Sequence, residues 1–305
     1  MSRAVIGAMC TYKRAHELQN SLDVLDEQTL CLDALVIVDN GSDPELPKLI
    51  GTHRLSSRIP IELIDPGENL GPAGGYGRAF DHIDEIAQDE DLVLILDDDD
   101  PPPSPTVVQE LVTAAELAFE EPTVGGIGLR GGQLDLRSGV IEPRPTGPII
   151  AEHADHLHGG WLPLYRVGAL RCADAFDRSL FWGFDDLELG RRLTRAGFAV
   201  RVAGDVFCRV SSPNKPAISK TLAERSWRHY YRHRNLLRVL HRDRAWRAIV
   251  SMVAIRLLTK PVANLVRSPR LAMWHLRTNL EALSDAFTTT PRFQSRHTPG
   301  KALAP

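Results

Sequence analysis

The strongest constraint in the sequence is a run of five apolar residues, Leu92–Leu96, followed at once by four aspartates, Asp97–Asp100. Such a run is typical of a strand buried on both faces, as in a parallel sheet. The carboxylates at its end must face solvent, a cation or both, because an isolated buried charge is very costly. Open α/β sheets bind ligands at this end of their strands, and closely spaced carboxylates suit Mg²⁺ or Mn²⁺. The alternative, a solvated acidic turn, is less favoured because the buried strand comes directly before the aspartates.

The alternation of an apolar strand, a polar loop and a helical pattern occurs four times in the first part of the chain. The expected strands are 4–9, 35–38, 61–64 and 92–96. Ser104 and Pro105 predict the start of the fourth helix, which runs to about Glu121. This order predicts an α/β fold with a mostly parallel sheet and right-handed crossovers. A further strand at 123–129 and a glycine-containing hairpin after it are also expected.

Polar groups follow each of these strands and should meet at one edge of the sheet. They are Thr11 and Arg14, Asp39 and Asn40, the glycine-rich stretch 69–77, and Asp97–Asp99. An aspartate after the second strand can accept a hydrogen bond from a ribose or a base, and arginine and backbone N–H groups can hold phosphate. Together the groups predict a site for a nucleoside diphosphate. The glycine stretch lacks the G-x-G-x-x-G pattern, which argues against an NAD-binding domain.

Two segments of the second half carry further candidates. His153, His156 and His158 raise a metal hypothesis, but the sequence shows no partner cluster, so loop histidines near a bound substrate are favoured. The glycines before Trp161 would let the backbone approach a ligand on which the indole stacks; the alternative is a core tryptophan after a flexible turn. A helix is expected in the segment 184–197, with three acidic residues near its start. One acid suffices to cap a helix, so a second can act as a general base.

Taken in order, the motifs resemble those of family 2 glycosyltransferases with the GT-A fold, over residues 3–240. They are T-x-x-R at Thr11–Arg14, V-D-N-G-S at Val38–Ser42, N-L-G-x-A-G-G at Asn69–Gly75, D-D-D at Asp97–Asp99, Gly160-Trp161, Trp182–Arg192, and the aromatic-Arg-Asn segment Tyr230–Asn235. Within the family the chain is most similar to actinobacterial galactofuranosyltransferases and related rhamnosyltransferases.

The resemblance implies a GT-A type fold, with a Rossmann-like, mostly parallel sheet and a C-terminal helical extension. It also implies an inverting glycosyltransferase that moves a sugar from a nucleotide-diphosphate donor, UDP-galactofuranose being favoured, to a lipid-linked or other glycan acceptor. Asp186 is the implied general base and Asp185 and Glu188 support it, while Asp97 and Asp99 hold Mg²⁺ or Mn²⁺. Binding roles follow for the donor at Thr11, Arg14, Asp39, Asn40, Asn69, Gly71, Gly74, Gly75, Asp97 and Asp98, and for the acceptor at Gly160, Trp161 and Trp182.

One departure concerns the metal. The resembling enzymes complete the metal shell with a histidine on the strand after the acidic helix, and the corresponding place here is near Cys208-Arg209. We expect either that Arg209 neutralises the diphosphate directly, or that His229 or His233 reaches the site from the next helix.

Two alternatives stay open. One is a dTDP-rhamnose-dependent rhamnosyltransferase that acts on a glycan or a small-molecule natural product. The other belongs to a different class: a non-catalytic sugar-nucleotide-binding protein would keep the motifs of the first half but would not need Asp186.

Charge is distributed unevenly along the chain. Lys220–Leu280 holds 14 Lys and Arg against two acids, a net charge of +12, which leaves −15 for the rest of the 305 residues. We therefore predict a catalytic domain at 1–215, divided near 125 into donor and acceptor halves, a basic helical region at 216–287 and a disordered tail at 288–305. Basic helices rich in Trp and Leu can lie on anionic membranes, or pack their apolar faces on the catalytic domain. Their apolar content argues against nucleic acid as the partner.

Composition and the N-terminus bear on location. The four cysteines show no C-x-x-C spacing, which is typical of reduced thiols. The chain enters a strand almost at once and shows no signal-peptide pattern. We expect a cytoplasmic protein that can sit at the inner face of the cell membrane.

Overall fold

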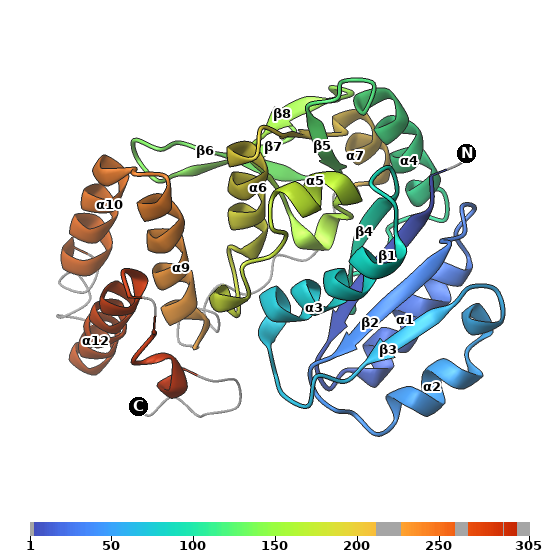
Figure 1. Cartoon of the computed structure of the whole chain (residues 1–305). Coiled ribbons are helices and arrows are strands. Elements are labelled where there is room, and N and C mark those ends of the chain that lie inside the picture. Colours follow the sequence, from blue (N-terminus) through green and yellow to red (C-terminus); the bar gives the residue numbers. More distant parts are fainter. Residues whose placement is uncertain (1–2, 212–226, 260–267, 289, 298–305) are drawn as a thin grey trace. The chain divides into compact units, whose positions relative to one another are not determined.

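The computed structural model describes residues 3–211, 227–259, 268–288 and 290–297. The chain forms two compact units (Figure 1). The first comprises Met1–Gln133, Pro143–Phe181 and Asp185–Pro213, and the second comprises Leu134–Glu142, Trp182–Phe184 and Asn214–Pro305. The predicted boundary between residues 215 and 216 lies outside the described residues.

An eight-stranded sheet forms the centre of the first unit, in the order β3-β2-β1-β4-β10-β5-β11-β8. Its strands are β1 (Val5–Thr11), β2 (Ala34–Asp39), β3 (Ile61–Ile64), β4 (Leu92–Asp97), β5 (Val124–Gly128), β8 (Glu152–Ala154), β10 (Leu164–Arg166) and β11 (Ala199–Val202). The strands β3, β2, β1 and β4 pair in parallel, as do β5 and β11, whereas β10 and β8 run antiparallel to their neighbours. The prediction of a mostly parallel α/β sheet is confirmed.

Helices cover both faces of this sheet, which explains the uninterrupted apolar strands (Figure 1). The helices on one face are α1 (Ala15–Asp26), α2 (Leu46–Thr52), α4 (Val107–Ala118) and α7 (Gly204–Val210). Those on the other face are α3 (Gly71–Ile86), α5 (Val167–Cys172) and α6 (Asp185–Arg195). Leu94 and Leu96 of β4 point into the first core, and Val93 and Ile95 into the second. Both faces of β4 are therefore buried, and only its aspartate end is polar.

A second, three-stranded sheet contains β7 (Ile141–Arg144), β6 (Gly131–Leu134) and β9 (His156–Leu157). Strands β6 and β7 form the hairpin that the glycines predicted, and its turn is closed by a hydrogen bond from the Gly139 N–H to the Asp135 carbonyl at 2.7 Å. Short 3₁₀ turns lie at η1 (Arg54–Ser57), η2 (Gly159–Trp161) and η3 (Arg178–Leu180).

Two helix starts differ from the prediction. Helix α4 begins at Val107 rather than near Ser104, because the Ser104 carbonyl accepts a hydrogen bond from the Gln28 side chain at 2.9 Å. Helix α3 begins at Gly71, so most of the glycine stretch that was expected to form a loop lies inside a helix.

Apart from the strand residues of its segment Leu134–Glu142, the regular elements of the second unit are helical in its described part. It contains α9 (Arg228–Arg242), α10 (Trp246–Val253), a π-helical turn η4 (Ala254–Thr259), α12 (Pro269–Ala286) and the 3₁₀ turn η5 (Gln294–Arg296). Apolar and aromatic side chains of α9, including Tyr230, Tyr231 and Leu240, are buried. None of the helices in the described ranges is long and apolar enough to cross a bilayer.

The tail has more structure than the sequence predicted. Residues 290–297 are described, and Asp285 of α12 accepts the backbone N–H groups of Arg292 and Phe293 at 2.9 and 2.8 Å. His297 lies 2.8 Å from the carboxylate of Glu281, also on α12. The prediction of a disordered tail from residue 288 is wrong for this segment, because acidic groups of α12 bind its backbone and a histidine. Residues 298–305 lie outside the described part of the chain.

Candidate active site

The acidic run lies at the carboxyl end of β4, within the parallel part of the sheet. Cys10, near the end of β1, is the register partner of Asp97. Carboxylate oxygens of Asp97, Asp98 and Asp99 lie within 4.8 Å of one another, and Asp98 is buried while Asp99 is exposed. The end of β4 therefore presents a compact set of oxygen donors, which we call the aspartate cluster.

The residues after β1 hold the middle aspartate in place. Thr11 Oγ1 donates a hydrogen bond to Asp98 Oδ2 at 2.7 Å, and Arg14 Nη1 donates one to Asp98 Oδ1 at 3.1 Å. The hydroxyl of Ser21 on α1 donates to the Asp98 carbonyl at 2.8 Å. Arg14 also forms an ion pair with Asp99. Asp98 is thus fixed on several sides, and Arg14 spans the cluster.

The electrostatics of the aspartate cluster fit a divalent cation. Burial and the nearby carboxylates of Asp99 and Asp98 raise the pKa of Asp97 to about 7. Burial also raises the pKa of Asp98, although Thr11 and Arg14 act in the opposite direction. Carboxylates that repel one another in a poorly solvated place are stabilised by a cation between them. The donors are all oxygens, which is the chemistry that Mg²⁺ and Mn²⁺ prefer.

Asp39 and Asn40 end the neighbouring strand β2, and both are buried. Asp39 accepts the backbone N–H groups of Gly41 at 2.8 Å and Asp43 at 2.6 Å. The Asn40 amide donates to the Gly71 carbonyl at 3.0 Å. Asp39 therefore closes the turn after β2, and Asn40 ties this turn to the start of α3.

The start of α3 needs glycine because other chain segments pass close to it. Gly71 has a φ of +68°, its N–H donates to Asn69 Oδ1 at 2.9 Å, and a Cβ there would lie 2.2 Å from the Phe181 carbonyl oxygen. A Cβ on Gly75 would lie 2.3 Å from Cys10 Sγ. A Cβ on Gly74 would lie 2.6 Å from the side chain of Leu70. These glycines bring α3 against β1, at the same edge as the aspartate cluster.

A second pair of carboxylates, Asp185 and Asp186, begins helix α6. Asp186 Oδ1 accepts the Leu187 N–H at 2.7 Å, and Asp186 Oδ2 lies 3.4 Å from His158 Nδ1. Burial acts to raise the pKa of Asp186, but the hydrogen bond from His158 and the positive charge of His156 and His158 outweigh it, so this pKa is lowered. Asp186 is therefore held ionised beside a histidine.

The histidine segment has a partner for a metal site in the structure, although none was predicted from the sequence. His156, His158 and Asp186 each place one ligand atom within 4.8 Å of the others, so the partner is the carboxylate at the start of α6. His156 is buried and His158 is half-buried, whereas His153 is exposed. This contact could not be predicted from the sequence, because it depends on how β9 lies beside α6.

The two carboxylate sites lie on the same side of the first unit. Burial raises the pKa of Tyr76, and the charges of Asp97 and Asp185 both add to this effect. The η2 turn also connects the sites, since it follows His158 in the chain and a Cβ on Gly160 would lie 3.6 Å from Asp97 Oδ2. A substrate at this edge can therefore meet both sets of carboxylates.

Glu188 does not face the same way as Asp186. It is fully buried, and its carboxylate pairs with Arg195 at 2.7 Å and Arg192 at 3.5 Å. Two residues along a helix correspond to about 200° of rotation, which turns Glu188 to the opposite side of α6. Its contacts are those of a residue that stabilises the helix.

The predicted acceptor tryptophans both have packed rings. The Trp161 ring lies 5.3 Å from the Phe207 ring, and the Arg130 guanidinium lies 5.6 Å from its centre. These contacts match the alternative interpretation, a tryptophan packed on the core. In the second unit, the Trp182 ring lies 5.4 Å from that of Trp227.

Asn235 of α9 holds the backbone that leads into Asp185. This residue is fully buried, and its amide nitrogen donates to the carbonyls of Trp182 at 2.9 Å and Gly183 at 2.8 Å. The neighbouring Arg234 is also buried and donates to Asn235 Oδ1 at 2.9 Å. The aromatic-Arg-Asn motif therefore positions the segment before the acidic helix, a role that sequence reasoning did not predict.

Two of the groups expected to replace the missing histidine, Arg209 and His229, have partners within their own units. Arg209 is on helix α7 rather than on a strand, and it pairs with Glu110 at 3.0 Å and Asp205 at 3.2 Å. His229 of the second unit contacts Asn279 at 2.8 Å, and burial lowers its pKa to about 3. Two carboxylates bind Arg209 in this structure, and the alternative in which Arg209 neutralises the diphosphate directly stays a prediction.

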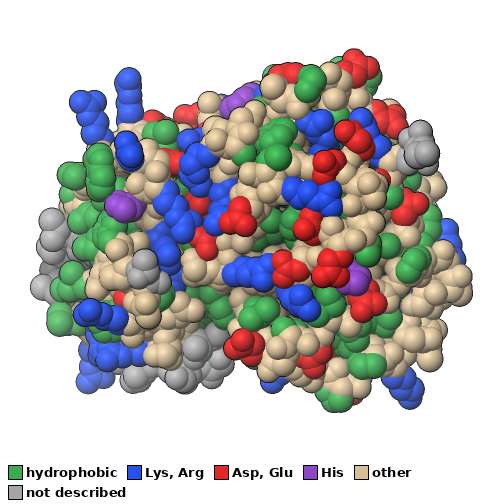
Figure 2. Space-filling model, viewed as in Figure 1, with side chains coloured by type: hydrophobic (Ala, Val, Ile, Leu, Met, Phe, Trp, Pro, Cys, Tyr) green, Lys and Arg blue, Asp and Glu red, His purple; other side chains and the backbone are tan. Residues whose placement is uncertain are grey.

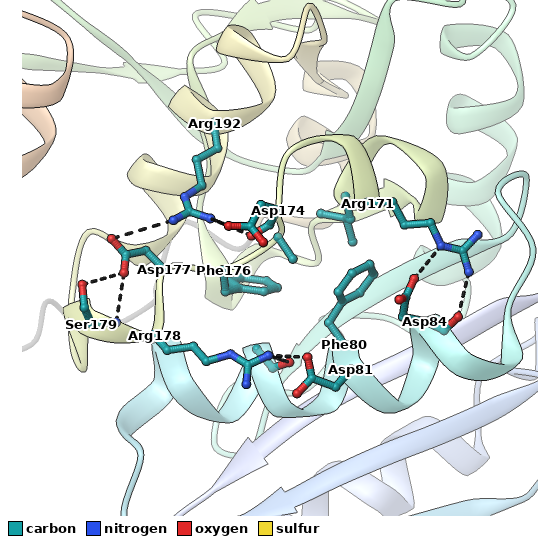
Figure 3. Close-up of a pocket in the computed structure, with 13 residues that line it drawn as sticks. Phe80, Asp81, Asp84, Arg171, Asp174, Phe176, Asp177, Arg178, Ser179 and Arg192 are labelled. Carbon is teal, nitrogen blue, oxygen red and sulfur yellow. Dashed lines mark hydrogen bonds and ion pairs between the residues drawn. The ribbon is translucent and has the colours of Figure 1, made fainter.

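A cavity of about 540 Å³ lies beside α3, lined by α5, the 174–179 segment and Arg192 of α6 (Figure 3). Phe80 and Phe176 form its apolar part. Charged residues line the rest: Asp81, Asp84, Asp174, Asp177, Arg171, Arg178 and Arg192. Side chains of both signs also alternate over much of the face in Figure 2. Several of these charged side chains pair with one another, among them Arg178 with Asp81 and Arg192 with Asp174.

Comparisons with known proteins show which families and structures the chain resembles. Residues 8–158 match the family model for glycosyl transferase family 2. Galactofuranosyltransferase GlfT1 of Mycobacterium tuberculosis is 32% identical over 208 residues, which cover 65% of this chain and 66% of that protein. GlfT1 of Mycolicibacterium smegmatis is 28% identical over 209 residues, 64% of this chain and 67% of that protein. The chain thus spans about two thirds of the length of these curated relatives.

Solved structures share the fold at low sequence identity. The mannosyltransferase PcManGT from Pyrobaculum calidifontis, in complex with GDP-Man and Mn²⁺, has a TM-score of 0.56 and 19% identity, covering 97% of this chain and 79% of that chain. The structure of TarS residues 1–349 from S. aureus, in complex with UDP, has a TM-score of 0.53 and 14% identity. The match covers 96% of this chain and 86% of that chain. The chain has the GT-A fold.

Proposed function

The chain carries a domain of glycosyl transferase family 2, and we propose that it is an inverting glycosyltransferase that uses a nucleotide-diphosphate sugar. The observation that carries this proposal is the pair of carboxylate sites at one edge of the sheet. The aspartate cluster has a raised pKa at Asp97, and Asp186 has a lowered one. The first suits a cation that binds phosphate, and the second suits proton removal.

On the donor side, the loops after β1, β2 and β3 bind the nucleotide. Asp39 and Asn40 lie at the end of β2, where a base or ribose would be recognised, and Arg14 lies beside the aspartates, where the diphosphate would lie. Asn69, Gly71, Gly74 and Gly75 would act on the donor by fixing the start of α3 beside its site, through the hydrogen bond from Gly71 to Asn69 and the close packing of the glycines. Asp97 and Asp99 would hold Mg²⁺ or Mn²⁺, and Asp98 would keep the cluster in place through Thr11 and Arg14. When bound, the cation stabilises the charge on the departing diphosphate.

On the acceptor side, the carboxylate of Asp186 takes the proton of the attacking hydroxyl. The hydroxyl oxygen forms a bond to the anomeric carbon of the donor sugar, the bond from that carbon to the diphosphate breaks, and the nucleoside diphosphate leaves with the electron pair. Attack from the face opposite the leaving group inverts the anomeric centre. His158 and the Leu187 N–H hold the base, and Asp185 adds negative charge between the two sites.

UDP-galactofuranose is the donor that we favour, because both curated relatives are galactofuranosyltransferases. The acceptor is then a glycan, and we assign its outer sugars to the cavity beside α3. Arg192, which lines the cavity, is six residues from Asp186 on α6, about 9 Å along the helix. A chain of two or three sugars spans that distance. A dTDP-rhamnose donor with a small-molecule acceptor stays the second candidate.

A lipid-linked acceptor would require contact with a membrane, and α10 offers a surface for it. Trp246 and Val250 are four residues apart on this helix and are 56% and 68% exposed. Arg244 and Arg247 are exposed next to them. Exposed aromatic and basic side chains on one helix fit the surface of an anionic bilayer.

A panel of donors tests the proposal. The purified chain is incubated with Mn²⁺ and, in turn, UDP-galactofuranose, UDP-galactopyranose, UDP-N-acetylglucosamine, dTDP-rhamnose and GDP-mannose, and the release of nucleoside diphosphate is measured. We expect release from UDP-galactofuranose, faster with a galactofuranosyl disaccharide present. If the chain binds a donor tightly but releases no diphosphate with any acceptor, it is a sugar-nucleotide-binding protein.

A further inference from the structure

The cluster of His156, His158 and Asp186 has the composition of a transition-metal site. Its three ligand atoms lie within 4.8 Å of one another, and they come from the β9–η2 segment and from the start of α6. His158 Nδ1 lies 3.4 Å from Asp186 Oδ2. Two atoms bound to one zinc ion at about 2.0–2.1 Å in tetrahedral geometry are about 3.4 Å apart. The spacing of this pair therefore already matches two neighbouring positions in a metal shell.

The buried member of the cluster has an unsatisfied nitrogen. His156 is 1% exposed, and its Nδ1 lacks a close hydrogen-bond partner among the described residues, although the Gly132 carbonyl faces the ring. Buried polar atoms in native proteins nearly always have a partner, and an exception calls for a water, an ion or a chemical role. A ring nitrogen of each imidazole that carries no proton and the oxygens of the carboxylate can all donate lone pairs, so a cation is a partner that can satisfy the whole group.

The donor set distinguishes this cluster from the aspartates after β4. Imidazole nitrogens suit Zn²⁺ and Co²⁺, whereas an all-oxygen set suits Mg²⁺ and Mn²⁺. His158 and Asp186 are only half-buried, which leaves room for water or a substrate oxygen on the open side. Three protein ligands with an open position form a common type of zinc site.

We propose that His156, His158 and Asp186 form a second metal site, selective for Zn²⁺ or Co²⁺ over Mg²⁺. A cation there takes a lone pair of Asp186 Oδ2, so this oxygen can no longer accept a proton from an acceptor hydroxyl. Zn²⁺ is therefore an inhibitor of transfer. This consequence rests on the proposed function, whereas the binding of the metal does not.

Cobalt spectroscopy on the full chain tests binding without any assay of activity. Co²⁺ is added in the presence of excess Mg²⁺, and visible absorption bands of low-symmetry, nitrogen-bound Co²⁺ are expected. His158→Gln should weaken this binding at least about 10-fold, because even the loss of a supporting residue costs that much at metal sites. His153→Gln, an exposed histidine on β8, is the matched control and should bind as the unchanged chain does. Asp97→Asn should also keep the bands, since it belongs to the other site.

His158 is the tested ligand because the buried His156 is more prone to disturb folding, and circular dichroism checks each variant. If no bands form, or if His158→Gln binds Co²⁺ as tightly as the unchanged chain, the metal site does not exist. The cluster is then a histidine–carboxylate hydrogen bond alone.

Inhibition by Zn²⁺ is measured next, at saturating Mn²⁺ and donor. We expect the rate to fall at least 10-fold as the site fills, and the Zn²⁺ concentration for half-inhibition to rise by a similar factor in His158→Gln. If Co²⁺ binds as expected but Zn²⁺ leaves the rate unchanged, the metal site stands and Asp186 is not the base. The failure of the site and the failure of the proposed function are therefore distinguishable.

Discussion

Two groups of aspartates, one after β4 and one at the start of α6, have the same chemical groups in opposite environments. The aspartate cluster collects like charges in a poorly solvated place, and the pKa of Asp97 rises to about 7. Asp186 stands at a helix start beside His158 and a backbone N–H, and its pKa falls. The comparison teaches that residue type alone does not assign a role. One group attracts a cation, and the other is held ionised to accept a proton.

The largest loss of kcat is expected when the proposed general base, Asp186, is changed. Asp186→Asn removes the proton acceptor but keeps the size of the side chain, so kcat should fall about 10²- to 10⁴-fold. The change is measured as the rate of diphosphate release at saturating donor and acceptor. Glu116→Gln, an exposed acid on α4, is the control and should leave the rate unaltered. A kcat within a factor of three of the unchanged chain would show that another group takes the proton.

A smaller loss is expected from the residue that positions the segment before the base. Asn235→Ala leaves the half-buried carbonyls of Trp182 and Gly183 without their donor, which costs about 0.5–1.5 kcal/mol of unfolding free energy. We expect kcat to fall about 10-fold with the KM for donor nearly constant, because the binding loops are untouched. Asn20→Ala, an exposed asparagine on α1, is the control. Loss of stability with full kcat would make Asn235 a purely structural residue.

The cavity beside α3 should affect affinity for long acceptors only. The pair change Asp81→Asn with Arg178→Gln removes an ion pair at its edge without altering the net charge. Hydrogen bonds worth about 0.5–1.5 kcal/mol would be lost, so the KM for a galactofuranosyl trisaccharide should rise about 2- to 10-fold. The KM for a monosaccharide acceptor serves as the internal control and should stay constant. Equal changes for both acceptors would place the glycan elsewhere.

Membrane contact through α10 is examined by flotation with liposomes that contain 30% anionic lipid or none. We expect binding to the anionic set that is weakened by salt, and a several-fold loss in Trp246→Ser. Leu117→Ser changes a comparably exposed apolar residue on α4 and should not alter flotation. Equal flotation of the Trp246 variant would exclude this face of α10 as the contact.

The smallest expected effect is the change in thermal stability, measured as Tm, when the pH is varied. In the folded chain Asp97 keeps its proton to about pH 7, whereas in the unfolded chain it ionises near its ordinary pKa of 3.8. The folded state thus binds more protons between about pH 4 and 7, so the contribution of Asp97 to stability falls as pH rises through this window and is constant above it. Adding Mg²⁺ should flatten this decline in Tm, and Asp97→Asn should abolish it. A Tm that is equally pH-dependent in the variant would assign the effect to another group.

Much of the fold could be predicted because it depends on local patterns. The apolar runs at 35–38 and 92–96 fixed the parallel strands, and the aspartates after β4 could only lie at the sheet edge. Contacts between segments far apart in the chain were not predictable. The pairing of His158 with Asp186 depends on how β9 lies beside α6. Arg209 was expected on a strand because the segment Val200–Val210 is mostly apolar, but helix α7 begins at Gly204 within this segment. The glycines at 71–77 looked like a loop, since close packing against β1 leaves no mark in the sequence other than glycine itself.

The most direct test of the division between the two carboxylate groups is calorimetry of UDP binding in the presence of Mn²⁺, with Asp97→Asn and Asp186→Asn compared side by side. The account predicts that Asp97→Asn weakens UDP binding about 10-fold or more, because the cation that bridges to the diphosphate is held less well, while Asp186→Asn binds UDP with unchanged affinity and fails to turn over. Equal loss of UDP affinity in both variants, or full affinity in Asp97→Asn, would contradict the assignment of the cation to one group and the proton to the other.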